Sequence, residues 1–64
     1  MNIRCDTWFE RDRAMVALVD ADTNTLIIDW WDTEVEELVE AGFLSSDDWE
    51  RSAIDYATHI GVLT

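Results

Sequence analysis

The segment from Ala14 to Val19 constrains the fold most, because every one of its residues is apolar. Such a run is apolar on both faces, as in a central β-strand or a short buried helix. Its valines are β-branched, and polar turn segments flank it at 10–13 and 20–24, which favours the strand. The sequence therefore predicts a central strand at about 14–19.

The segments on either side of this run are also predicted to be strands. Residues 2–9 alternate between apolar and polar side chains, and residues 25–31 are rich in β-branched and aromatic side chains. Because the connections are short, the simplest topology is a three-stranded antiparallel meander.

One face of this sheet is expected to pack on helices and the other to stay open. In the third strand, Leu26, Ile28 and Trp30 form the more apolar face, which we assign to the core. The open face is then predicted to carry three large apolar side chains, namely Trp8, Ile27 and Trp31. So much apolar surface on a small protein indicates a dimer interface or a partner site, or else a mostly solvated face with partly covered rings.

A first helix is predicted over about 33–41. Thr33 and Glu36 have the spacing of a capping box, in which Thr33 is the N-cap. Gly42 suits the left-handed position that follows a helix. Val35 and its apolar neighbours fall at helical spacing, and glutamates take most of the remaining positions.

A second helix is predicted over about 46–60, with Ser45 or Ser46 as its cap and Gly61 as its stop. The residues at core spacing in it are Trp49, Ala53, Tyr56, Ala57 and Ile60. The sequence thus predicts an α+β fold, in which a three-stranded meander (about 2–9, 14–19 and 25–31) precedes two helices packed on one of its faces. We expect one small domain over 1–64, with a core that supplies only about 3–5 kcal/mol of net stability.

The charge of the chain is strongly negative and unevenly placed. Fifteen carboxylates face four arginines and no lysine, which gives a net charge of −11. Residues 1–19 are neutral overall, so residues 20–64 carry all of the excess. Such a surface repels nucleic acid and anionic membranes and attracts cationic protein surfaces.

A catalytic or metal site is not expected. The sole cysteine, Cys5, and the sole histidine, His59, lie in no nucleophile motif. The segment beginning at Asp20 has the first ligands of a calcium loop, but Thr25 stands where glycine is needed and Trp31 where glutamate is needed. We therefore expect no enzyme activity, no cofactor and no bound metal. No signal peptide or membrane span is evident, so the expected location is the cytoplasm.

The remaining candidate site is the set of carboxylates on the two predicted helices. Glu36 and Glu40 are one helical turn apart, about 6 Å along the axis, which is of the same order as the spacing of phosphates on a nucleic-acid strand. The candidate partner-binding residues are Glu34, Glu36, Glu37, Glu40, Asp47, Asp48, Glu50 and Asp55. Two simpler explanations remain open: an ordinary solvated helix face, or adaptation to molar salt, in which acids keep a protein soluble.

In its length, acidity, α+β pattern and acidic segment from Glu34 to Glu40, the chain resembles phage-encoded nucleic-acid mimics. Among these it is most similar to the small acidic anti-CRISPR proteins that inhibit type I surveillance complexes. The resemblance covers the whole chain in character and includes no diagnostic motif, so no residue roles are transferred. It implies that the acidic face binds a basic channel of a Cas subunit that normally receives target DNA.

The sequence therefore predicts a non-enzymatic inhibitor that mimics nucleic-acid charge and binds a basic nucleic-acid-binding protein, without contacting nucleic acid or membrane itself. The alternative is a small interaction or homodimerisation module that uses the open aromatic sheet face. We expect a monomer or a weak homodimer.

Overall fold

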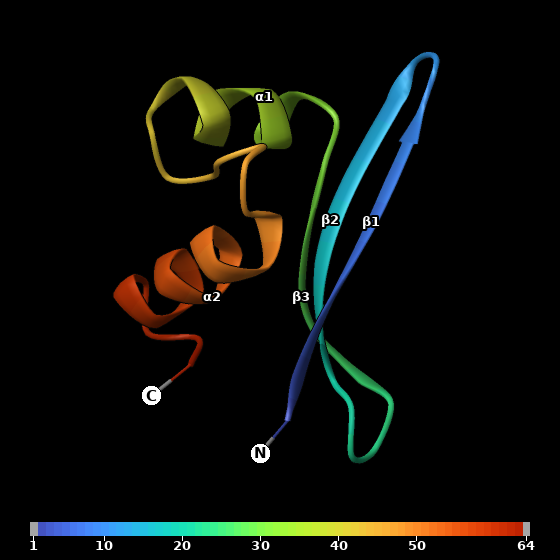
Figure 1. The fold of residues 1–64 in the computed structure, drawn as a ribbon, viewed down its shortest axis with the longest axis vertical. Coiled ribbons are helices and arrows are strands. Elements are labelled where there is room, and N and C mark those ends of the chain that lie inside the picture. Colours follow the sequence, from blue (N-terminus) through green and yellow to red (C-terminus); the bar gives the residue numbers. More distant parts are fainter. Residues whose placement is uncertain (1, 64) are drawn as a thin grey trace.

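The computed structural model describes residues 2–63 as a three-stranded antiparallel sheet followed by two helices, an α+β fold (Figure 1). The elements are β1 (Ile3–Glu10), β2 (Arg13–Asp20), β3 (Thr25–Trp31), α1 (Thr33–Glu40) and α2 (Trp49–His59). The strand order is β1-β2-β3, so the predicted meander and its central strand are confirmed. Both helices lie on the same side of the sheet (Figure 1).

The central strand is buried on both faces, as its composition predicts. Val16 and Leu18 point toward the helices and are fully buried. Ala17 and Val19 alternate with them and point to the open face, where neighbouring side chains cover them almost completely. Because β1 and β3 pair with β2 on either side, its backbone is also protected.

A β-bulge in β3 overturns one part of the predicted pattern. Leu18 pairs with Ile28 and Val19 pairs with Leu26, so Ile27 is the extra residue. A bulge shifts the alternation of side chains by one position. Ile27 therefore packs against the core, and Leu26 lies on the open face with 54% of its surface exposed. The predicted faces of Leu26 and Ile27 were wrong.

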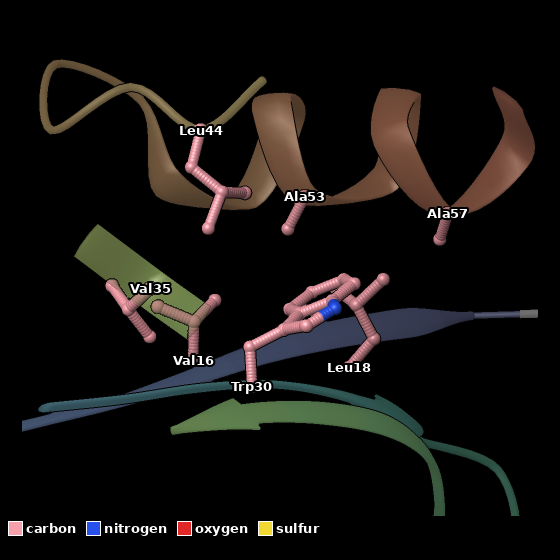
Figure 2. Packing of buried hydrophobic residues seen from close by; sticks show 7 residues of the cluster. All are labelled: Val16, Leu18, Trp30, Val35, Leu44, Ala53 and Ala57. Atoms are coloured by element: carbon pink, nitrogen blue, oxygen red, sulfur yellow. The ribbon is translucent and has the colours of Figure 1, made fainter. Parts of the chain in front are cut away.

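The core lies between the sheet and the helices (Figure 2). Its buried members are Val16, Leu18, Trp30, Val35, Leu44, Ala53 and Ala57. Ala53 and Ala57 point from α2 toward the sheet, and their small size lets the helix approach the large ring of Trp30 (Figure 2). Burial of a leucine or a valine contributes about 1.5–3 kcal/mol, so a few such side chains dominate the stability of a chain this short.

The start of α1 differs from the predicted capping box. Asp32, not Thr33, is the N-cap, and its side chain makes no capping hydrogen bond. Its carboxylate is engaged elsewhere, because the Ala14 N–H donates to Asp32 Oδ1 at 2.9 Å. The Asp32 N–H in turn donates to the Ala14 carbonyl at 2.8 Å. The prediction of a capping box at Thr33 and Glu36 was thus wrong, because a tertiary contact to β2 fixes the entry to the helix.

The end of α1 is formed as predicted. Gly42 has φ of +85°, the left-handed conformation that glycine adopts without strain. The Phe43 N–H donates to the Leu38 carbonyl at 2.8 Å, and the Gly42 N–H donates to the Val39 carbonyl at 3.1 Å. This pair of bonds is the Schellman motif, which satisfies carbonyls that the helix leaves free.

The second helix begins three residues later than predicted. Its N-cap is Asp48, whose Oδ1 accepts a hydrogen bond from the Arg51 N–H at 3.1 Å. Such a cap stabilises a helix by about 1 kcal/mol. Ser45 and Ser46 were wrongly predicted as caps. Ser45 instead fixes the preceding loop, since its N–H donates to Ser52 Oγ at 3.0 Å.

Candidate functional site

The eight predicted carboxylates all reach solvent, and we call this set the acidic surface. Its members are Glu34, Glu36, Glu37 and Glu40 on α1, and Asp47, Asp48, Glu50 and Asp55 on or just before α2. Every one of these residues is exposed. The helices hold them opposite the side that contacts the core, which is the ordinary consequence of an amphipathic pattern.

The α1 part of the acidic surface is rigidly held and has no cationic partner among residues 2–63. Val35 is buried and Leu38 is half-buried, so the helix is anchored through one side. The ion pairs of the described chain are Arg4–Asp6, Arg13–Asp32 and Arg51–Asp55. None of them includes a glutamate of α1, so these charges are available to an external cation.

The α2 part of the acidic surface is divided between structural and free groups. Asp48 caps the helix, as described above. Asp55 lies 3.9 Å from Arg51, but both side chains are largely exposed, so the pair adds little stability. Asp47 and Glu50 take part in no ion pair of the described residues. The sequence could not distinguish these roles, because all four residues are simply acids near a helix start.

The structure brings only some of these carboxylates together. Asp48, Glu50 and Asp55 border one open depression of about 530 Å³, which also contains Arg51 and Ile54. A different depression of about 460 Å³ separates α1 from the tip of the β1–β2 hairpin.

Glu36 borders this second depression together with Arg11 and Arg13 of the hairpin. The remaining members, Glu34, Glu37, Glu40 and Asp47, border neither of the two. Glu37 and Glu40 therefore cap no helix and border neither of these depressions.

Two carboxylates of the acidic surface, Asp48 and Glu50, also act electrostatically on Cys5. This residue is half-buried on β1. Burial raises the pKa of the Cys5 thiol, and the negative charges of Glu50, Asp6 and Asp48 raise it further. Both effects disfavour the thiolate, because burial and like charge each oppose its formation. Its surroundings thus favour the thiol form of Cys5 over the thiolate, which is the reactive form.

We predict that Cys5 of the folded protein reacts with iodoacetamide more slowly at pH 8 than the same cysteine in urea. The raised pKa lowers the fraction of thiolate, the reacting form, and unfolding removes both causes. Glu50→Gln removes one of the contributing charges and should speed the reaction, whereas Glu34→Gln, a matched change on α1, should not. Mass spectrometry of the alkylated chain follows the rate. Equal rates in folded and unfolded protein would contradict this reading.

The predicted secondary interface is partly assembled by the sheet. Trp8 and Trp31 lie on the open face, with 54% and 41% of their surfaces exposed. Ile27 does not join them, because the bulge turns it toward the core. Met15 and Leu26 take its place, and only the register of strand pairing identifies them.

The other chemical candidates are engaged in local structure. Asp20 Oδ1 accepts a hydrogen bond from the Asp22 N–H at 2.9 Å, and Asn24 has φ of +58°, as a hairpin turn requires. His59 is stacked on Phe43, with ring centroids 6.1 Å apart. Within residues 2–63, no three potential metal-ligating side chains form a group that could hold an ion. No helix in this part of the chain is both long and apolar enough to cross a membrane.

The fold and the acidic surface define the molecule as a small, strongly acidic α+β protein. No protein-family model matches the chain, and comparisons with curated proteins and with solved structures give no match.

Proposed function

We propose that the protein is a non-enzymatic inhibitor that mimics nucleic-acid charge. In this proposal, the acidic surface occupies the DNA-binding groove of a basic nucleic-acid-binding protein in the cytoplasm. The main support is the exposure of the α1 glutamates, which have no cationic partner in the described chain. The chain has a net charge of −11 and no lysine. It is therefore negatively charged, as DNA is, and is attracted to the same cationic grooves.

The rigidity of α1 favours this mode of binding. The Schellman motif closes the helix at Gly42, and Asp32 ties its first residue to β2. The backbone that carries these carboxylates is already ordered, so association costs the ordering of the glutamate side chains but not that of the chain itself. The arginines and lysines of a DNA-binding groove normally contact phosphates, and carboxylates are alternative anionic partners for the same side chains.

The Cas subunits that receive target DNA in type I surveillance complexes have the chemistry that this surface requires. They are the first partners to test. The general form of the proposal covers any basic groove that binds duplex or single-stranded nucleic acid. Binding in every such case should weaken steeply as salt rises, because the attraction acts between exposed charges.

The double variant Glu37→Lys/Glu40→Lys is expected to lose binding while keeping its fold. Both side chains are exposed and outside the core, so circular dichroism should match that of the wild type. In the variant, two lysines face the basic groove, and this repulsion reduces the binding free energy by several kcal/mol. The affinity should therefore fall by about 100-fold or more. The measurement is competition with a labelled target duplex for a purified type I surveillance complex.

The matched control is Glu10→Lys/Asp12→Lys on the hairpin, which changes the net charge by the same amount at two other exposed acids. It should compete nearly as well as the wild type. Capture of partners from a host lysate at low and high salt extends the test to other basic proteins. If the α1 variant competes for every captured protein as strongly as the wild type, the proposed mimicry is wrong.

A further inference from the structure

On the face of the sheet opposite the helices, which we call the open face, three cross-strand rows of side chains span all three strands. The register places Trp8, Met15 and Trp31 in one row and Arg4, Val19 and Leu26 in another. Asp6, Ala17 and Asp29 form the row between them. Neighbouring strands are about 4.8 Å apart, so the members of a row are in reach of one another.

The first row is an aromatic hollow. Trp8, Met15 and Trp31 line a depression of about 360 Å³, with Glu10 and Arg13 also at its border. Trp8 and Leu26 are each 54% exposed, and Trp31 is 41% exposed. Tryptophan is among the residues that contribute most to protein interfaces when it is covered.

The side chains of this face are already oriented. Trp31 Nε1 donates a hydrogen bond to Asp29 Oδ2 at 3.1 Å. The Arg13 guanidinium lies 5.7 Å from the centroid of the Trp31 ring. Arg4 binds Asp6 through Nε at 2.9 Å. A face whose side chains are fixed in advance loses less entropy when it is covered.

The charge of this face distinguishes it from the rest of the surface. Asp6, Glu10 and Asp29 stand against Arg4 and Arg13, so the face is close to neutral in a chain of net charge −11. Two copies that approached through their helices would bring the acidic surfaces together. A second copy thus meets less repulsion at the open face than at the acidic surface.

We propose that the open face is the interface of a weak homodimer. Consider a twofold axis that lies between two stacked sheets, perpendicular to the strands, at the row containing Ala17. This axis places the row of Arg4, Val19 and Leu26 over the row of Trp8, Met15 and Trp31 of the second copy. Arg4 then meets the ring of Trp8, a cation–π pair, and Leu26 meets Trp31. Ala17, at the centre of this row, is small, but Asp6 and Asp29 in the same row each face the same carboxylate of the second copy across the axis. This repulsion opposes the dimer at low salt and is screened at molar salt.

The size of the face sets the strength of the dimer. Three strands span about 14 Å and eight residues about 26 Å, so the face covers under 400 Å² per copy. Stable complexes cover about 800 Å² per partner. The dimer therefore forms at high protein concentration and dissociates on dilution. It leaves the acidic surface outside the interface, so it does not depend on the proposed function.

Sedimentation velocity over protein concentrations from about 10 µM to about 1 mM, at low and at molar NaCl, measures the association. We expect a reversible monomer–dimer equilibrium with a larger dimer fraction at molar salt. Salt screens the repulsion between two copies of charge −11, and it does not weaken apolar contact. Partner binding through the acidic surface has the opposite salt dependence, so the two proposals fail separately.

Trp8→Ala tests the face directly and should weaken the dimer by about tenfold or more. Phe9→Ala is its matched control, because Phe9 is the next residue, is similarly exposed at 51%, and points to the helix side, where its ring lies 5.2 Å from that of Trp49 in a tilted arrangement. Phe9→Ala should leave the dimer unchanged. Leu26→Arg gives a second readout at the other end of the face, and circular dichroism checks each fold. A monomer at every concentration in both salts would overturn the proposal, as would a dimer that Trp8→Ala and Leu26→Arg leave intact.

Discussion

Leu18→Ala is expected to leave the protein largely unfolded at 25 °C. Leu18 is fully buried at the centre of the core, between Val16 and the residues of α2. Truncation of a buried leucine to alanine costs about 2–5 kcal/mol. A domain of this size has only about 3–5 kcal/mol of net stability. Far-ultraviolet circular dichroism should therefore show loss of helix and sheet. The summed tryptophan emission should shift to longer wavelength, because Trp30 is buried in the folded protein and becomes solvated.

Leu26→Ala is the matched control for this prediction. The substitution is chemically identical, but Leu26 is 54% exposed on the open face. We expect its urea midpoint to lie close to that of the wild type. If Leu18→Ala and Leu26→Ala shift the midpoint equally, the assignment of the two faces of the sheet is wrong.

Salt is expected to stabilise the fold markedly. On α1, Glu36 lies one turn before Glu40, and Glu37 is three residues from both Glu34 and Glu40. Each like-charge pair of this kind costs about 0.2–0.5 kcal/mol, so α1 alone contributes about 1 kcal/mol of repulsion. The other acids of a chain with net charge −11 add to this. Thermal unfolding at NaCl concentrations from low to molar should show a steady rise in melting temperature, because the screening length falls from about 10 Å at 0.1 M to about 3 Å at 1 M.

A neutralised variant separates this effect from the general influence of salt on apolar contacts. Glu37→Gln/Glu40→Gln removes charge from α1 without changing its shape. The variant should start from a higher melting temperature at low salt and gain less as salt is added. If salt raises the melting temperature of the variant as much as that of the wild type, repulsion on α1 is not the cause of the stabilisation by salt.

The order of elements could be predicted from the sequence because hydrophobic periodicity and turn residues are local signals. The apolar run that became β2 and the glycine that ends α1 are read from a few adjacent residues. Ile28, Trp30 and Trp31 lie on the predicted faces of β3. The faces of Leu26 and Ile27 could not be predicted, since the bulge at Ile27 leaves no mark in composition and shifts the side-chain alternation by one position.

The caps of both helices were mispredicted for a related reason, although α1 begins at Thr33 as predicted and only α2 begins later. Asp32 makes no capping bond because its carboxylate accepts a hydrogen bond from Ala14 of β2. These two residues are far apart in sequence, so local patterns cannot reveal the contact. Asp48 was predicted only as part of the binding surface, and the structure shows that it also caps α2. An aspartate suits either role, so its residue type did not distinguish them. The exposure of the acidic surface followed from helical periodicity, whereas its division between two depressions depends on how the helices and the hairpin tip are placed.

The double contact between Asp32 and Ala14 has a consequence for the order of folding. Asp32 has φ of +46°, a backbone conformation that costs about 1–3 kcal/mol in residues other than glycine. That conformation is held only when the start of β2 is in place beside the end of β3, because both hydrogen bonds join Asp32 to Ala14. An eight-residue helix is too short to persist alone in water. The α1 carboxylates are thus held in an ordered arrangement only after the sheet has formed. A partly folded chain without the sheet would have the same charges but not this arrangement.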